Sequence, residues 1–74
     1  MINEKLRSLV VRSGKLQLEV AKHFGIIPQQ MNRKFSRASF KVSELVRLAE
    51  FTGTKLAFID ENDKPVIIFD MNDL

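Results

Sequence analysis

The sequence of 74 residues contains no cysteine, a single histidine and no long apolar run. Without cysteine the chain can form neither disulfide bonds nor thiolate metal sites, although this absence by itself identifies no compartment. Because no stretch of about 18 apolar residues occurs, we expect no membrane-spanning segment. The first residues, Met1 to Lys5, are followed at once by polar and charged positions, which does not fit a secretory signal. The cytoplasm is therefore the expected location.

The lack of cysteine and of a second histidine also limits the catalytic sites that the chain could form. The one histidine, His23, falls on the exposed side of a predicted helix. With no cysteine, no second histidine and no glycine-rich phosphate loop, the chain lacks the groups from which catalytic sites are usually built. Asp60 and Asn62 have the spacing of the first calcium-loop ligands, but Pro65 and Met71 stand where that loop needs glycine and glutamate. We expect no enzyme, no metal, no cofactor and no small-molecule substrate.

Positive charge is concentrated in the N-terminal part of the chain. Residues 1–59 carry eleven lysines and arginines against four glutamates, whereas residues 60–74 carry one lysine against five acidic residues. Between Arg12 and Lys41 there are seven basic residues and a single acid, Glu19. A local field of this sign favours a polyanionic partner. An ordinary solvated basic surface is the alternative explanation of the charge alone.

Hydrophobic periodicity predicts one mainly α domain spanning residues 1–74, with four helices followed by a C-terminal β-hairpin. The predicted helices cover residues 3–13, 17–24, 28–36 and 43–52. After Gly53 the apolar period changes from about 3.6 residues to about 2, which predicts a hairpin. The two strands and their turn are expected within residues 55–70.

Both faces of the predicted hairpin are apolar. A lone hairpin is marginally stable in water, and one of its faces can pack on the helices. The other face, or a free strand edge, then needs a partner, and a second copy of the chain is the simplest candidate. We expect a homodimer whose interface contains Ala57, Ile59, Ile67 and Phe69.

Residues 17–36 have the pattern of a helix-turn-helix. Ala21 is small where two short helices would cross, Gly25 supplies the sharp turn, and Met31 is an apolar residue that buries the joint. A small bundle whose turn happens to contain glycine is the alternative. The surrounding basic charge and the polar character of helix 28–36 favour a motif that binds duplex DNA.

At these residues the chain resembles the Cro/repressor family of lambda-repressor-like helix-turn-helix proteins. The resemblance covers about residues 3–53. Its motifs are Gln17-x-x-Val20-Ala21-x-x-Phe24-Gly25-Ile26-x-Pro28-Gln29-Gln30-Met31, and Leu45-Val46-Arg47-Leu48-Ala49 followed by Gly53. It implies a sequence-specific transcriptional regulator whose helix 28–36 enters the major groove while helix 17–24 braces it against the backbone. Cro-type members also dimerise through C-terminal strands.

The resemblance gives individual polar residues an expected role. Glutamine and asparagine can pair with adenine in the major groove, and arginine with guanine. Base contacts are expected from the exposed start of helix 28–36 and one turn further on, at Gln29, Gln30, Asn32 and Arg33. Phosphate contacts position a protein on DNA without reading its sequence. They are expected from Gln17, Lys15, Lys34 and Arg37.

Two features depart from the family pattern. Leu16 and Ile27 stand where the family usually has a serine or threonine N-cap, and Lys41 precedes helix 43–52 in the same way. Each is followed three residues later by the glutamate or glutamine of a capping box, so three half-boxes are expected. Together with Leu18, the first two residues also place apolar groups on the surface expected to face DNA.

Two explanations of this apolar surface remain open. In the first, Ile27 touches a thymine methyl group and the leucines pack locally, so that DNA binding is retained. In the second, the surface binds a protein, and the chain is an interaction module, such as an antirepressor or antitoxin-like protein, with reduced DNA binding. RNA binding is less favoured, because no exposed aromatic residues are arranged to stack on bases.

Overall fold

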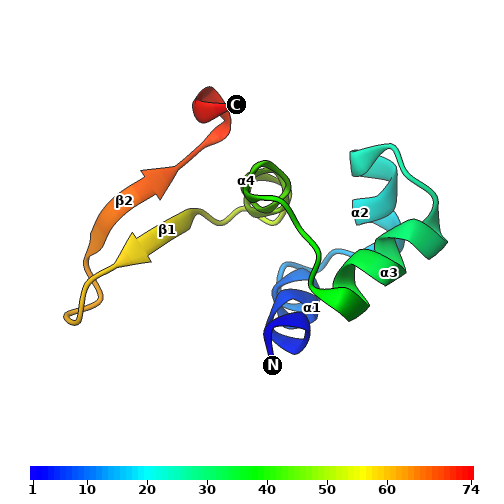
Figure 1. The fold of residues 1–74 in the computed structure, drawn as a ribbon, viewed down its shortest axis with the longest axis horizontal. Coiled ribbons are helices and arrows are strands. Elements are labelled where there is room, and N and C mark those ends of the chain that lie inside the picture. The colour runs from blue at the N-terminus through cyan, green and yellow to red at the C-terminus, as the bar shows by residue number, and fades with distance from the viewer.

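The computed structural model describes residues 1–74 and shows four helices followed by a two-stranded hairpin (Figure 1). The elements are α1 (Ile2–Arg12), α2 (Gln17–Phe24), α3 (Pro28–Arg37), α4 (Val42–Phe51), β1 (Leu56–Ile59), β2 (Pro65–Phe69) and the 3-10 helix η1 (Met71–Asp73). The predicted mainly α fold with its C-terminal hairpin is confirmed, and each predicted helix end lies within one residue of its place in the structure. None of the four helices is long and apolar enough to cross a membrane.

The core is made by the four helices alone. On α3, Met31 and Phe35 are four residues apart, so they lie on one face, and both are completely buried. Around them pack residues of the other three helices, and the hairpin contributes none. The buried cluster consists of Val10, Val20, Ala21, Met31, Phe35 and Leu48.

The ends of α2 and α3 are both formed by residues in the left-handed region. Gly25 ends α2 with φ 70°, a conformation that glycine adopts without steric cost, and this gives the sharp turn predicted from the sequence. Ala38 ends α3 with φ 50° and ψ 40°, where an alanine is strained by its Cβ atom. The sequence gives no sign of this second left-handed cap.

Two of the three expected half-boxes are present. The backbone N–H of Leu16 donates to Oε1 of Glu19 at 2.9 Å, and that of Lys41 donates to Oε1 of Glu44 at 2.9 Å. Neither Leu16 nor Lys41 provides a side-chain cap. At the start of α3 the expected bond to Gln30 is absent, and this helix begins with proline at its first position.

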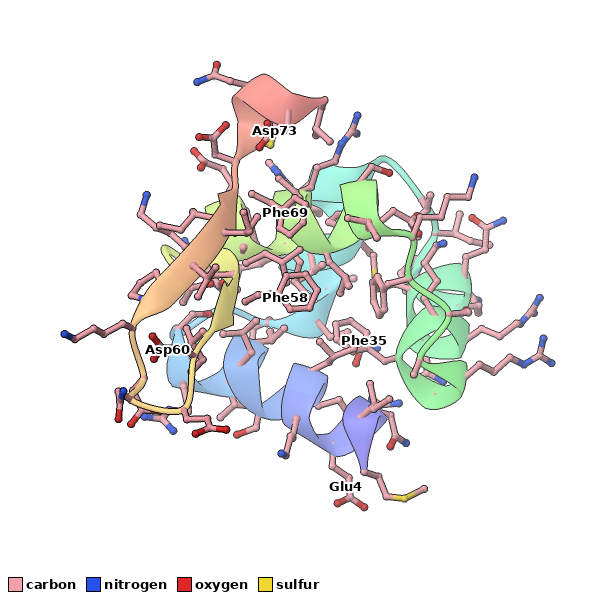
Figure 2. All side chains as sticks on the ribbon, turned by 60° about the vertical axis from the view of Figure 1, so that its left-hand side comes forward. Glu4, Phe35, Phe58, Asp60, Phe69 and Asp73 are labelled. Atoms are coloured by element: carbon pink, nitrogen blue, oxygen red, sulfur yellow. The ribbon has the colours of Figure 1, made fainter.

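The hairpin extends from the helical body on the side of α4 opposite α2 and α3 (Figure 1). Strands β1 and β2 pair antiparallel, with Leu56 opposite Phe69 and Phe58 opposite Ile67. The Phe58 and Phe69 rings have centroids 6.0 Å apart (Figure 2). Together with Leu56 they border an apolar pocket shared with α4. We call the face that carries Leu56, Phe58, Ile67 and Phe69 the inner face. Leu56 and Phe69, nearest α4, are half-buried, whereas Phe58 and Ile67 are more than half exposed.

This register separates the residues that were expected to share the dimer interface. Opposite residues of an antiparallel pair share a face. Ile67 and Phe69 therefore lie on the inner face, whereas Ala57 pairs with Ile68 on the outer face. The expected set of Ala57, Ile59, Ile67 and Phe69 is thus divided between two faces. The register depends on the turn and on a bulge between Phe58 and Ile59, neither of which the apolar alternation reveals.

Candidate nucleic-acid interface

The outward face of α3 carries a stripe of polar side chains. Because Met31 and Phe35 point into the core, residues on the opposite side of the helix must face away from it. Gln29, Arg33 and Arg37 are spaced four residues apart and occupy this side on successive turns. All three are exposed. We call these three residues the α3 stripe.

The side chains of the α3 stripe are free to bind a partner. None of the three forms a hydrogen bond or an ion pair within the chain, and the same holds for the neighbouring, exposed Gln30. Three of the four expected base contacts and one expected phosphate contact are thus brought together on one helix face. Two arginines side by side also make this face positively charged.

Gln17 and Asn32 are placed differently, because both are bonded to an arginine of α1. Arg7 Nη1 donates to Oε1 of Gln17 at 2.9 Å. Its Nη2 donates to Oδ1 of Asn32 at 3.4 Å and to the Ser36 hydroxyl at 3.0 Å. The expected phosphate contact and the expected base contact therefore form part of a network that joins α1, α2 and α3.

Arg7 is a site residue that the sequence reasoning missed. It stands three residues before buried Val10, so it lies at the edge of the buried face of α1. Its guanidinium carbon is 5.6 Å from the centroid of the Phe35 ring, a cation–π distance. A charged residue at the edge of an apolar stripe is the sequence signal that could have identified it, but its three partners come from distant positions in the chain.

Lys34 and Lys15, the two lysines expected to contact phosphate, both have partners within the chain. Lys34 Nζ lies 2.8 Å from Oε2 of Glu44, at the first turn of α4. Lys15 Nζ lies 5.1 Å from the centroid of the Phe51 ring, near the end of α4. The position of each ammonium group is therefore set by a contact with α4, and the charge of Lys34 is balanced by Glu44.

The ion pair with Lys34 changes the acidity of Glu44. Partial burial raises the pKa of this carboxyl group, but the hydrogen bonds from Lys34 and from the Lys41 backbone, with the charges of both lysines, outweigh burial. The pKa of Glu44 is therefore lowered from its ordinary value of 4.5. At neutral pH the carboxylate is ionised and binds the first turn of α4 to α3.

Apolar residues border the polar surface at the starts of α2 and α3. Leu16 is 64% exposed, and Leu18 and Ile27 are also at least half exposed. Leu18 lines a shallow hollow together with Gln17, Gln29 and Asn32. Close local packing therefore does not cover these side chains, and any partner that contacts Gln29 meets apolar surface beside it.

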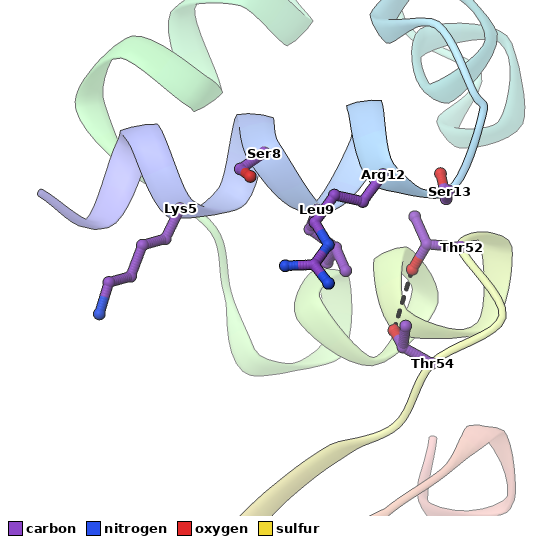
Figure 3. Close-up of a pocket in the computed structure, with 7 residues that line it drawn as sticks. All are labelled: Lys5, Ser8, Leu9, Arg12, Ser13, Thr52 and Thr54. Carbon is purple, nitrogen blue, oxygen red and sulfur yellow. Dashed lines mark hydrogen bonds between the residues drawn. The ribbon is translucent and has the colours of Figure 1, made fainter.

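The largest hollow of the molecule lies elsewhere, between α1 and the end of α4 (Figure 3). Two of its hydroxyl groups donate to nearby backbone: Ser13 to the Val10 carbonyl at 2.6 Å, and Thr52 to the Leu48 carbonyl at 2.9 Å. Thr52 and Thr54 share a further hydrogen bond of 2.9 Å (Figure 3). These bonds stabilise the end of α4, and no group of three or more potential metal ligands lies together anywhere in the structure.

Comparisons of this chain with protein-family models, with curated proteins and with solved structures gave no match. The resemblance to the Cro/repressor family therefore depends on the motif residues of the sequence alone.

Proposed function

We propose that this protein is a sequence-specific transcriptional regulator of Cro/repressor type, which binds duplex DNA with α3 in the major groove. The observation that carries the proposal is the α3 stripe of Gln29, Arg33 and Arg37, exposed and unbonded on the outer helix of a helix-turn-helix. A helix of ten residues is about 15 Å long, and an α-helix fits the major groove of about 12 Å width.

The residues of the stripe suit different contacts. Gln29 has both amide atoms free and can pair bidentately with adenine, and Arg33 can donate twice to guanine. Arg37, in the last turn of α3, is placed for phosphate. Since Leu16 provides no side-chain cap, the backbone amides of Gln17 and Leu18 have no acceptor within the chain. The Glu19 carboxylate, bonded to the Leu16 N–H, lies at the same helix start and opposes a phosphate there.

The same proposal includes a homodimer formed through the outer face of the hairpin. Ile68 on this face is 47% exposed, and it does not line the pocket that the hairpin shares with α4. The outer edges of both strands are unpaired. Unpaired backbone groups on an exposed apolar strand favour pairing with another chain. In a two-fold dimer the two α3 helices would contact half-sites about one DNA turn, roughly 34 Å, or a multiple of it apart.

Selection from a pool of random-sequence duplexes tests this function. We expect the protein to enrich one short motif, present twice in inverted orientation because the dimer is two-fold symmetric. A pool that stays random after repeated rounds at low salt would contradict the proposal.

A second candidate function is a protein-interaction module on the same fold. The observation that favours it is the exposure of Leu16, Leu18 and Ile27 beside the polar surface. These side chains would bury apolar area against a protein partner, whereas on DNA they could contact thymine methyl groups and sugars. Changing Leu18 to serine separates the two functions, because it would remove an anchor from a protein interface but leave the phosphate and base contacts of the α3 stripe in place.

A further inference from the structure

We infer that Arg7 is a positioning residue that determines which bases Asn32 can read, an inference that rests on the proposed DNA-binding function. Arg7 belongs to α1, outside the helix-turn-helix, and it has no place in the expected set of DNA contacts. Its guanidinium group nevertheless bonds to one side chain of α2 and two of α3. It therefore controls the side chains at the edge of the proposed interface.

The chemistry of arginine fixes the orientation of the amides that it binds. A guanidinium group has five N–H donors and no acceptor. Only the oxygen of a side-chain amide can face it, so the NH2 group must point away. This applies to Gln17, whose Oε1 accepts from Arg7 at 2.9 Å, and to Asn32, whose Oδ1 accepts from Arg7 at 3.4 Å.

Asn32 is constrained a second time. Nε2 of Gln17 donates to the same Oδ1 atom at 3.5 Å. A carbonyl oxygen has two lone pairs, and here both are directed at donors of the protein. Asn32 is exposed, and its NH2 group, which has no partner in the chain, is the part left to contact DNA.

An asparagine with only its NH2 group free has a different base preference from a free asparagine. Bidentate pairing with adenine requires a donor and an acceptor on the same amide. Asn32 presents donors only, so it suits acceptor groups such as guanine N7 and O6, thymine O4 or a phosphate oxygen. Gln29 keeps both amide atoms free, so Gln29 and Asn32 differ in the base groups that they can contact. The expected pairing of Asn32 with adenine is thereby replaced.

Arginine is required for this arrangement because its planar fork spans several acceptors at once. The guanidinium group reaches three oxygens while its carbon lies 5.6 Å from the Phe35 ring centroid. Lysine carries the same charge, but its three donors sit on one rotatable nitrogen and do not form this planar fork. An Arg7→Lys variant therefore keeps the charge and loses the orientation.

The test compares Arg7→Met with Lys5→Met in selection from a random duplex pool. Both changes remove one positive charge from α1, but Lys5 forms none of these bonds. We expect Lys5→Met to keep the wild-type preference at every position. Arg7→Met, and also Arg7→Lys, should gain about ten-fold in relative preference for adenine at the base pair that Asn32 contacts. Unchanged preferences in Arg7→Met would overturn the inference.

A second variant tests the donor function of Asn32 while Arg7 stays in place. Asn32→Asp keeps an oxygen that can accept from Arg7, replaces the NH2 group with a second oxygen and adds a negative charge. We expect its unfolding temperature to match or exceed that of the wild type, while DNA affinity falls about ten-fold or more. Undiminished affinity in this variant would contradict a donor function for Asn32.

Measurement on the free protein distinguishes failure of this inference from failure of the proposed function. By NMR, the side-chain NH2 signals of Gln17 and Asn32 should shift in Arg7→Met and stay in place in Lys5→Met. Signals that are unchanged in both variants would refute the proposed orientation of the two amides, whether or not the protein binds DNA. If the duplex pool selected with the wild-type protein stays random, the DNA-binding function is refuted instead. The NMR result would still show how the amides of Gln17 and Asn32 are oriented.

Discussion

The ammonium group of Lys34 lies 2.8 Å from Oε2 of Glu44, which links the proposed recognition helix α3 to the first turn of α4. Glu44 uses its other oxygen to accept the backbone N–H of Lys41 at 2.9 Å. One carboxylate thus closes the start of α4 and holds α3 against it. The ion pair with Lys34 requires the ionised carboxyl group, and the backbone hydrogen bond is stronger to that form, which makes this joint sensitive to acid.

We predict that part of the stability of the protein is lost at low pH through Glu44. Its pKa is lower in the folded chain than the ordinary 4.5, so its contribution is complete above about pH 4.5 and disappears as pH falls through the folded value. Glu44→Gln should lower the free energy of unfolding by on the order of 1 kcal/mol at neutral pH. Thermal unfolding of both proteins between pH 7 and 3 should show this difference shrink below about pH 4.5. A difference that persists unchanged to pH 3 would be inconsistent with the ion pair.

Replacing Ala38 with glycine should stabilise the protein. The φ of 50° at this position strains an alanine but not a glycine, and the expected gain is about 0.5–1 kcal/mol. For a domain of this size that corresponds to a rise of several degrees in the midpoint of thermal unfolding. Ser39→Gly is the matched control, because Ser39 has no positive φ and the change should be neutral or destabilising. A fall in the midpoint of Ala38→Gly would show that strain at Ala38 is not relieved.

Leu16→Thr should also raise the midpoint of thermal unfolding. Leu16 has the extended backbone of an N-cap but no oxygen to accept an amide, and its side chain is 64% exposed, so little burial is lost. A threonine cap is worth about 1 kcal/mol. Leu18→Thr is the control, since the same change inside α2 lowers helix propensity without capping. Equal effects of the two variants would mean that position 16 does not act as a cap.

Dimerisation through the outer hairpin face is tested by Ile68→Lys. We expect sedimentation equilibrium to give a dimer for the wild type and a monomer for this variant, because a lysine opposite Ala57 cannot be buried without a partner. Val11→Lys, at a 74% exposed apolar residue of α1, should remain dimeric. A monomeric wild type, or dissociation in both variants, would refute this interface.

Arg33 and Arg37 should differ in their effect on DNA. Arg33→Ala should weaken binding by about 1–3 kcal/mol and relax specificity at one base pair, whereas Arg37→Ala should weaken all duplexes about equally. Affinities of each variant for the selected sequence and for single-base variants of it give this comparison. If the two substitutions act alike on every sequence, the division into base and phosphate contacts is wrong.

The sequence predicts the helices of this fold well because their signals are local. Apolar spacing, Gly25 at a turn and Pro28 at a helix start each depend on a few neighbouring residues, and the structure places all of them as expected. The hairpin was also predicted, but its register was not. One bulge between Phe58 and Ile59 decides which side chains share a face, and alternation of apolar residues does not reveal a bulge.

The candidate site was predictable in part for the same reason. Gln29, Gln30 and Arg33 are exposed as expected, because the helical period turns them away from the core that Met31 and Phe35 enter. Arg37 joins them because α3 continues one residue beyond the predicted helix end. The contacts of Arg7 with Gln17 and of Lys34 with Glu44 join residues at least ten positions apart. Such pairs depend on how the helices pack, and no local pattern in the sequence specifies that.

Titration of the protein with duplex DNA at two salt concentrations tests the central proposal most directly. If α3 and the basic residues around it bind DNA, the logarithm of the binding constant should fall linearly with the logarithm of salt concentration. For the three basic phosphate contacts of each protomer, Lys15, Lys34 and Arg37, the slope would be roughly −3 per protomer and about twice that for a dimer. A protein that binds no duplex even at low salt would contradict DNA binding and favour the protein-interaction module.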